Sequence, residues 1–565
     1  MADRLLDRQL RQLEPIRYTF GPGVTRRVAK LLARLGARRF PDVASLIGFH
    51  ETLLFLRAFP HGPATIRQTQ GLLRGFSQRV EQLRRAGADM DEFDPLEVSG
   101  IAGATMQDTL SYDLVLWMVK HLPGKLEIAW DDYHDERAMG AVWPLLMPLQ
   151  AEDAYVEADV PWRKWLQTVR PEGKSQLRWL VEQIQQLPGS ALEKSRVYDR
   201  LRLPVRWMVG NQRYSRTLNW KTPRETFYHR GPLITRSEVS LAEQLAQPPP
   251  VLRRLPRAAG EAAMNLIREI MLVRYRELYG TTLGDPNSVV RADVGRGVSI
   301  YLWNLPPGRR LPLRAYVAGF TLKNGVPINY IEAIGVCEWM EVGFNTFYTF
   351  RGGEVAWIFA QALRCLARLT GATCISMYPY QLGDGNDEAI ESGAYWFYRK
   401  LGFRPARAEQ ARLVEREERR IARDRKHRTS ARTLRRLAAA HLIYELPGGK
   451  PGAWDKFSPR TIGLEVNRRM AREFQGDSTK LRRTASAALA KILGEGLSEW
   501  TVPEKEAFEN FAVLLRRVPV LSWRAIEKRD LVQLIRAKAG PDEMRYLRLT
   551  QKHVRLREAL LQLGS

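Results

Sequence analysis

Apolar residues recur at three- and four-residue spacing along the first part of the chain. Such spacing places them on one face of an α-helix, and it predicts helices over residues 44–59, 110–122 and 174–189. The last of these runs into Pro188-Gly189, a natural helix stop. We therefore expect residues 1–245 to form a mainly helical N-terminal domain.

Three consecutive prolines, residues 248–250, interrupt this pattern. Proline cannot continue a helix, and proline-rich stretches are stiff. Residues 246–260 are therefore predicted to be a linker between domains. A strong helical pattern resumes over residues 261–280 and closes on Gly280, as helices commonly do.

The pattern then changes from helical to β-rich. Asn324-Gly325 separates two runs of β-branched and aromatic residues within 313–336, and this dipeptide is the strongest short hairpin signal that a sequence offers. A strand at 297–305 precedes this hairpin, and further elements follow it in order: a strand at 341–350, a helix at 353–370, a strand at 373–380, a helix at 393–403 and a strand at 440–446. This order predicts an α+β or mixed α/β domain over residues 261–446.

Helical spacing returns over residues 447–565 and predicts a helical C-terminal domain. Within the central domain, residues 404–438 are basic and are predicted to form a helical insertion. The expected fold class is thus α+β or mixed: a central α/β domain with a mixed sheet, flanked by all-helical N-terminal and C-terminal domains.

Charge narrows the choice of partners. The 565 residues include 88 Lys and Arg against 62 Asp and Glu, a net charge of +26. An excess of this size favours polyanionic partners such as RNA, DNA or anionic lipid. No apolar run approaches the roughly 20 residues that cross a bilayer, and the N-terminus lacks an uninterrupted apolar stretch, so we expect a cytoplasmic protein with no membrane span.

The candidate metal ligands have the wrong spacing for a metal site. The three cysteines, Cys337, Cys365 and Cys374, include no C-x-x-C pair, which is typical of buried reduced thiols. Asp131, Asp132, His134 and Asp135 are nearly consecutive and would point in different directions, as in a solvated turn. We expect no metal site.

The turn Arg351-Gly352-Gly353-Glu354 is a candidate phosphate-binding site. It joins the strand at 341–350 to the helix at 353–370. The first amides of a helix are unpaired, and together with the helix dipole they attract phosphate. Glycine lets a ligand approach the backbone closely. Arg351 adds a donor for charge-assisted hydrogen bonds.

The central domain resembles the GNAT superfamily of acyl-CoA-dependent N-acyltransferases in the order of its elements. A strand, an Arg-Gly-Gly turn, a helix and a second strand are followed by a helix that contains "AYWFYRKLGF". The pyrophosphate loop of that family, Arg/Gln-x-x-Gly-x-Gly/Ala, falls on residues 351–356. Its later helix is matched by Ala394, Tyr398, Lys400, Gly402 and Phe403. The resemblance covers residues 260–446. Glu354 stands where the loop has its central glycine, and Glu391 stands where the family frequently has asparagine.

The resemblance implies transfer of an acyl group from acetyl-CoA, or from another acyl-CoA, to an amine. Tyr398 would protonate the leaving thiolate. The general base would be a glutamate on or before the strand that leads to the loop: Glu341 is favoured over Glu332, with Glu338 and Asn345 on the substrate side. The donor would be held by Phe350, Arg351, Gly352, Gly353, Glu354, Val355 and Ala356.

Three interpretations remain open. The first is a GNAT-type transferase that acts on an unidentified amine. The second is a transferase on the same fold that takes an aminoacyl-tRNA or another carrier-bound donor, for which the charge and the altered loop argue. The third is a non-catalytic module that binds nucleic acid or protein, for which Glu354 and Glu391 argue. The basic segment 416–436 would contact phosphates without sequence specificity, or would be a solvated insertion.

Overall fold

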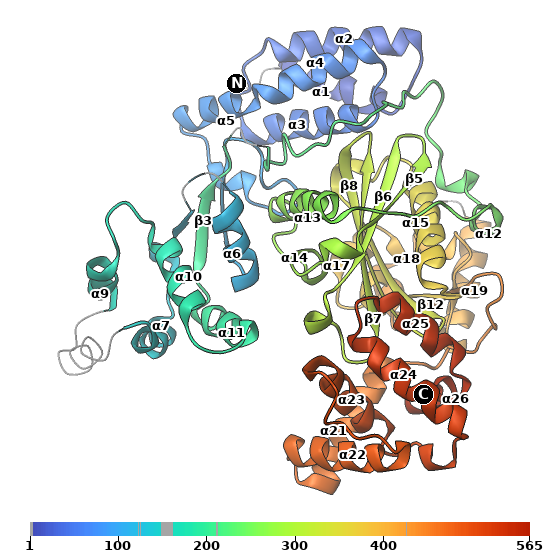
Figure 1. Ribbon diagram of the computed structural model, residues 1–565. Coiled ribbons are helices and arrows are strands. Elements are labelled where there is room, and N and C mark those ends of the chain that lie inside the picture. Colours follow the sequence, from blue (N-terminus) through green and yellow to red (C-terminus); the bar gives the residue numbers. More distant parts are fainter. Residues whose placement is uncertain (1–3, 123, 125, 148–161, 211–212, 425) are drawn as a thin grey trace. The chain divides into compact units, whose positions relative to one another are not determined.

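The computed structural model describes residues 4–122, 124, 126–147, 162–210, 213–424 and 426–565 (Figure 1). The chain divides into two compact units. Unit 1 comprises Met1–Pro232, Ala262–Leu283 and Lys323–Pro327. Unit 2 comprises Leu233–Glu261, Gly284–Leu322 and Ile328–Ser565.

Unit 1 begins with a layer of packed helices (Figure 1). The central one, α3, is buried on almost every side because apolar residues surround its axis, and Asp42 caps its start by accepting from the Ser45 amide at 2.7 Å. The helices are α1 (Arg4–Ile16), α2 (Pro22–Gly36), α3 (Val43–Ala58), α4 (Pro63–Arg74) and α5 (Phe76–Arg85).

The rest of unit 1 combines helices with a small antiparallel sheet in the order β1-β3-β2. Its strands are β1 (Thr105–Thr109), β2 (Leu126–Ile128) and β3 (Pro204–Met208), and its helices are α6 (Tyr112–His121), α7 (Glu136–Val142), α9 (Trp162–Val169), α10 (Gln176–Gln186) and α11 (Ala191–Leu201). The predicted helices at 44–59, 110–122 and 174–189 are confirmed as α3, α6 and α10. The sheet escapes prediction because three to five residues are too few to establish an alternating pattern.

Unit 2 is built on a nine-stranded sheet in the order β11-β12-β10-β9-β8-β7-β6-β5-β4. β9 and β10 are parallel, whereas β9 with β8 and β10 with β12 are antiparallel, so the sheet is mixed as predicted. The strands are β4 (Arg253–Arg254), β5 (Val290–Gly295), β6 (Val298–Asn304), β7 (Ala315–Lys323), β8 (Val326–Val336), β9 (Trp339–Thr346), β10 (Cys374–Met377), β11 (Arg404–Pro405) and β12 (Leu442–Glu445).

The Asn324-Gly325 turn joins β7 to β8, which confirms the predicted hairpin. Both residues have positive φ, 48° and 77°, as a two-residue type I′ turn requires. The tip, Lys323–Pro327, belongs to unit 1.

Helix α15 (Val355–Thr370) is the crossover that joins the parallel strands β9 and β10 (Figure 1). Parallel neighbours cannot be joined by a tight hairpin, so a crossover helix is the usual connection. It packs through buried residues such as Phe359 and Leu363 and ends at Gly371, whose φ of 73° suits a glycine cap. Shorter helices follow: α16 (Pro379–Leu382), α17 (Asp387–Glu391), α18 (Ala394–Arg399), α19 (Ala408–Arg423) and α20 (Ala431–Ala438).

The C-terminal helices, which lie in the domain predicted at 447–565, belong to the same compact unit as the sheet. Their attachment is specific: Lys538 and Glu543 form a buried ion pair at 2.6 Å, and the Tyr546 hydroxyl donates to the Leu313 carbonyl. The helices are α21 (Pro459–Phe474), α22 (Ser478–Leu493), α23 (Val502–Leu515), α24 (Ala525–Ala539), α25 (Glu543–Lys552) and α26 (Val554–Leu563).

The segment 246–260, predicted to be a linker, lies within unit 2. Strand β4 pairs with β5, and α12 (Leu241–Ala246) packs on α15, where Gln361 donates to Gln244 at 2.8 Å. Helix α13 (Arg257–Leu272) joins unit 1 from Ala262 onward. There the Trp117 indole donates to Asn265 at 3.0 Å.

No helix in the described part of the chain combines the length and the apolar character that crossing a bilayer requires.

Candidate functional site

Strand β9 runs on past the carboxyl end of its parallel partner β10. Their pairing covers only Trp339–Glu341 against Cys374–Ser376. β9 continues to Thr346, still paired with β8, while β10 ends at Met377. Within the described residues, the last part of β9 therefore has no strand partner on the β10 side. The carboxyl ends of parallel strands are the usual place for ligands in α/β sheets.

The turn after β9 leaves amides open at this same end. The Phe350 and Gly353 amides are used within the turn, each at 2.9 Å from a carbonyl, and the Ile358 amide donates to the Glu354 carbonyl at 3.0 Å. For the amides of Val355, Ala356 and Trp357, no acceptor is found among the residues that the structure describes. The head of α15 thus has three adjacent amides without an acceptor at the positive end of the helix dipole; Ala356 is buried, whereas Val355 and Trp357 are half-buried.

The two glycines of the turn are not required by backbone conformation. Neither Gly352 nor Gly353 has a left-handed φ. Gly352 is exposed and Gly353 is half-buried. What the glycines provide is bare backbone beside the open amides, which is what a closely approaching ligand requires.

The Glu354 carboxylate is bound by groups outside α15 and not by the amides of its own helix. It is fully buried and accepts from the Ile234 amide at 3.2 Å and from Arg296, whose Nε lies 3.2 Å from Oε2. It makes no side-chain cap on its own helix. The charge of the acid that replaces the expected glycine is therefore compensated by Arg296.

Arg351 and Phe350 contribute to the turn in different ways. Phe350 is buried beneath it. Arg351 pairs with Glu388 and lies 3.8 Å above the centre of the Tyr348 ring. The pair is partly exposed, and such pairs contribute only about 0–1 kcal/mol, so Arg351 can exchange Glu388 for a phosphate at little cost.

Tyr398 lies in the apolar core. It is 3% exposed and contacts Phe359 and Phe403, with ring centres 5.5 and 5.9 Å away. Its hydroxyl has no hydrogen-bond partner in the described structure, and burial raises the pKa of the phenol. A phenol enclosed in this way does not reach a leaving group at the strand ends, so the geometry argues against the acid role implied by the resemblance.

Tyr398 and Glu341 face opposite sides of the sheet. Phe344 contacts Phe359 of α15 at 5.0 Å between ring centres, which places Phe344 on the α15 side with Tyr398. Glu341 lies three residues earlier on β9 and therefore faces the other side. The two predicted catalytic residues are not brought together.

Glu341 and Glu338 are both held by cations. One oxygen of Glu341 accepts from Arg314 at 2.7 Å and the other from Arg460 at 3.2 Å. Glu338 accepts from the Trp454 indole at 3.0 Å and from Arg557 at 2.6 Å. Both oxygens of Glu341 are therefore occupied, whereas both donors to Glu338 bind its Oε1. The contacts with Arg460, Trp454 and Arg557 make the two residues anchors for the C-terminal segment.

Glu332 is a better candidate for the general base than Glu341, because one of its carboxylate oxygens has no partner among the described residues. It lies opposite Gly343 in the β8–β9 register and is half-buried. One of its oxygens accepts from the Tyr316 hydroxyl, while the other has no partner among the described residues. The sequence shows the alternation along β8. It does not show that Glu332 lies opposite Gly343 of β9, which makes Glu332 the better candidate.

Further polar groups surround Glu332 and form what we term the polar patch: Tyr316, Tyr330, Glu332, Asn345 and Gln381. Asn345 donates to the Tyr330 hydroxyl at 2.9 Å, and these two residues are paired across the strands. A Cβ at Gly343 would lie 3.5 Å from the Gln381 side-chain oxygen. The predicted substrate residue Asn345 therefore belongs to a cluster of polar side chains near the carboxyl end of β9.

A histidine that the sequence did not single out lies beside β10. His441 Nδ1 is 2.8 Å from the Ser376 hydroxyl, and Ser376 is the register partner of Glu341. Burial lowers the pKa of His441. A neutral imidazole at this point is a second proton acceptor, and the isolated histidine before a strand offered no pattern by which to find it.

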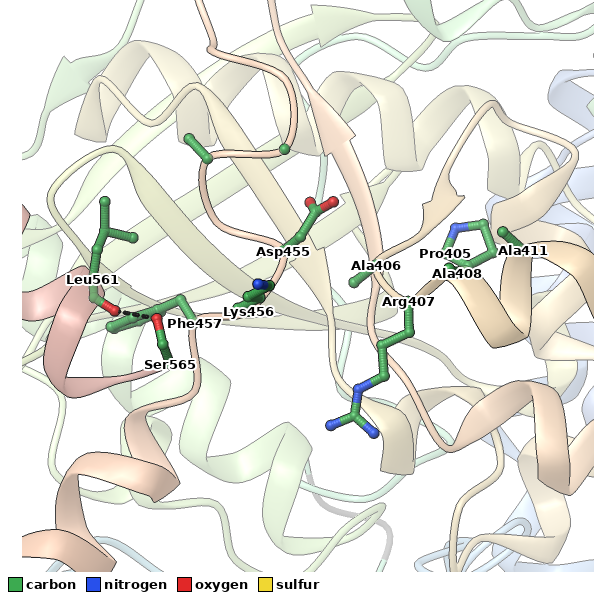
Figure 2. A pocket seen from close by; sticks show the side chains of 12 residues that line it. Pro405, Ala406, Arg407, Ala408, Ala411, Asp455, Lys456, Phe457, Leu561 and Ser565 are labelled. Carbon is green, nitrogen blue, oxygen red and sulfur yellow. Dashed lines mark hydrogen bonds between the residues drawn. The ribbon is translucent and has the colours of Figure 1, made fainter.

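A cavity of about 570 Å³ lies elsewhere in unit 2, beside β11 and the start of α19 (Figure 2). Arg407, Lys456 and Asp455 are among its lining residues, and Asp455 is paired with Arg404 at 2.8 Å. No histidine, cysteine or glutamate lines it. The cavity can bind a small molecule, but it offers little for proton transfer.

In the described residues, no three His, Cys, Asp or Glu side chains lie close enough together to hold a metal ion. Cys337, Cys365 and Cys374 are buried and free, as predicted, and burial raises the pKa of each thiol.

No protein-family model, curated protein or solved structure matches the chain. The function therefore has to be inferred from the residues and distances given above.

Proposed function

We propose that unit 2 is a GNAT-like N-acyltransferase that moves an acyl group from CoA, or from another carrier thioester, to an amine. The observation that supports this most is the coincidence of two features at one place. β9 extends past the carboxyl end of β10, and the amides of Val355, Ala356 and Trp357 have no acceptor among the described residues at the same end of the β9–α15–β10 unit.

The donor is placed by backbone groups. The pyrophosphate lies against the open amides at the head of α15, where both hydrogen bonds and the dipole favour an anion. The bare backbone of Gly352 allows the approach. The unpaired edge of β9, Val342–Thr346, offers strand-like hydrogen bonds to the amide-containing arm of the carrier.

The acceptor amine lies on the polar patch. Its nitrogen attacks the thioester carbonyl carbon, so a C–N bond forms and the C–S bond breaks. The amine proton passes to the free oxygen of Glu332, which the Tyr316 hydroxyl orients. The thiolate departs and takes a proton from water. Asn345 and Tyr330 position the amine by hydrogen bonds.

Donor binding is tested with a matched pair of variants in the turn. Gly352→Asp places a carboxylate beside the open amides, while Gly352→Asn adds a neutral side chain of the same size. Calorimetry with acetyl-CoA should show binding to the native chain, at least tenfold weaker binding to the Asp variant and a smaller effect of Asn. No binding at millimolar acetyl-CoA, or equal effects of Asp and Asn, would contradict CoA binding at this turn.

A second candidate is a non-catalytic module on the same scaffold. The burial of Tyr398 favours it, because the phenol that the family uses as an acid is unavailable here. The two candidates separate in a turnover assay that follows release of free CoA thiol in the presence of a panel of amines. Release that depends on amine and is lost in Glu332→Gln supports the transferase; absence of release supports the module.

A further inference from the structure

Helix α19 has two sharply different sides. Its buried residues, Gln410, Leu413, Val414 and Glu417, fall at three- and four-residue spacing on one side. The opposite side carries what we term the arginine stripe: Arg412, Arg416, Arg419 and Arg423, all exposed. Their spacing of four, three and four residues aligns them along one face of the helix.

The stripe differs from neighbouring cations in lacking acidic partners. Arg399 pairs with Glu418 at 3.0 Å, Arg420 with Glu417 at 2.8 Å and Arg435 with Asp387 at 2.8 Å. None of the four stripe arginines forms an ion pair within the part of the chain that the structure describes. Like charges three and four residues apart destabilise a helix by about 0.2–0.5 kcal/mol per pair. Exposed Glu415 lies three residues after Arg412 and four before Arg419 and offsets part of this repulsion, and a polyanion would relieve the rest.

The helix is firmly attached to unit 2, so the stripe is presented on a fixed support. Buried Glu417 accepts from His427 and Thr429, both at 3.0 Å, and the Trp396 indole donates to Thr429 at 3.1 Å. These contacts fix the loop that follows α19. Eleven residues separate Arg412 from Arg423, which is roughly 16 Å along a helix.

We propose that the arginine stripe binds the phosphodiester backbone of a nucleic acid. Guanidinium groups suit phosphate because their planar donors can bind two oxygens at once. A length of roughly 16 Å covers about five nucleotides of one strand at 3.4 Å each. The net charge of +26 gives the long-range attraction that such binding uses.

A membrane surface fits the stripe less well. Helices that lie on membranes insert apolar side chains beside their cations. The large apolar side chains of α19, Leu413 and Val414, are buried. The stripe also lacks aromatic rings and amide side chains that read bases, so it contacts phosphates and has no sequence preference.

The test uses two variants of equal charge in the full-length protein. The stripe variant carries R412Q, R416Q, R419Q and R423Q. The control carries K480Q, R482Q, R483Q and K491Q, which removes the same charge from exposed positions of α22 that have no ion pair among the described residues. Circular dichroism and thermal melting establish that both variants fold.

Binding is followed by fluorescence anisotropy with a labelled 20-nucleotide single-stranded RNA, a duplex RNA and a duplex DNA, over a range of salt. The stripe variant should lose at least tenfold in affinity at low salt, and its log–log salt slope for single-stranded RNA should fall by about 3. The three probes show which nucleic acid is preferred. A Lys variant at all four stripe positions should keep most of the slope.

Two outcomes overturn the proposal. One is equal loss in the stripe and control variants, which would mean that net charge alone attracts the nucleic acid. The other is unchanged nucleic-acid binding in the stripe variant together with lost binding to phosphatidylserine vesicles, which would assign the stripe to a membrane. Neither outcome bears on acyl transfer, because no stripe residue belongs to the proposed active site.

Discussion

The guanidinium of Arg296 is paired with the fully buried carboxylate of Glu354, directly beside the first turn of α15. Arg296 has a φ of 51°, a left-handed backbone that is unusual for a non-glycine residue. The pair explains how an acid is tolerated where the resemblance predicts glycine. The charge of Glu354 is compensated by Arg296, and the carboxylate accepts from none of the three amides at the head of α15.

Breaking this pair should destabilise unit 2. Arg296→Asn keeps a residue that tolerates left-handed φ but leaves the carboxylate without its cation, so we expect a loss of about 3 kcal/mol in the free energy of unfolding. Urea denaturation measures it. The double variant with Glu354→Gln should recover most of the loss, because the uncompensated charge is gone. If the double variant is no more stable than Arg296→Asn, the ion pair is not what holds this turn.

Glu332→Gln should abolish most transferase turnover. The amide has the size of the carboxylate but cannot accept the amine proton, so we expect kcat to fall by about 10²–10⁴ with the affinity for acetyl-CoA unchanged. Steady-state kinetics with calorimetry on the same sample separate the two quantities.

Glu341→Gln is the comparison for this prediction. Because Glu341 is held by Arg314 and Arg460, its substitution should lower the melting temperature more than the rate per folded molecule. A large loss of kcat in Glu341→Gln with full activity in Glu332→Gln would reverse the assignment and restore the prediction made from the sequence.

Tyr398→Phe should leave turnover unchanged. The hydroxyl is buried without a partner in the described structure, and removing an unsatisfied buried polar group is neutral or stabilising, here by up to about 1 kcal/mol. Melting temperature and kcat are measured together. A loss of kcat by tenfold or more at unchanged stability would show that the phenol reaches the reaction after all.

Much of this fold is predictable because its signals are local. Helical spacing is enough to locate α3, α6, α10 and α15, and Asn324-Gly325 locates the β7–β8 turn, since each depends on neighbouring residues alone. The site depends on pairing between distant strands. Alternation along β8 cannot tell that Glu332 faces Gly343, and the "YWFY" cluster fits both an active-site tyrosine and a core tyrosine until the position of Phe359 is known.

Domain boundaries likewise depend on contacts between distant segments. The prolines at 248–250 signal a break in local structure, but they do not show that the Pro248 carbonyl accepts from Arg364 of α15. Likewise nothing in the spacing of the C-terminal helices predicts the buried Lys538–Glu543 pair. Local pattern gives the elements, whereas the compact units are decided by contacts between segments far apart in sequence.

Unit 1 should lose stability as the pH falls from about 6.5 to about 4. His50 is completely buried, and burial lowers its pKa from 6.5 to about 4. The unfolded chain therefore binds a proton in this window that the folded unit does not, so stability is fully present above pH 6.5 and declines below it, by up to about 3 kcal/mol. Urea denaturation between pH 4 and 8 measures how the free energy of unfolding changes with pH. His50→Gln should show a weaker dependence on pH. This variant should also be less stable at pH 7, because the contact of His50 with Thr217 is changed. NMR of histidine-labelled protein gives the direct check: a His50 ring that titrates near pH 6.5 in the folded state would contradict the prediction, because a group with an ordinary pKa adds no pH dependence.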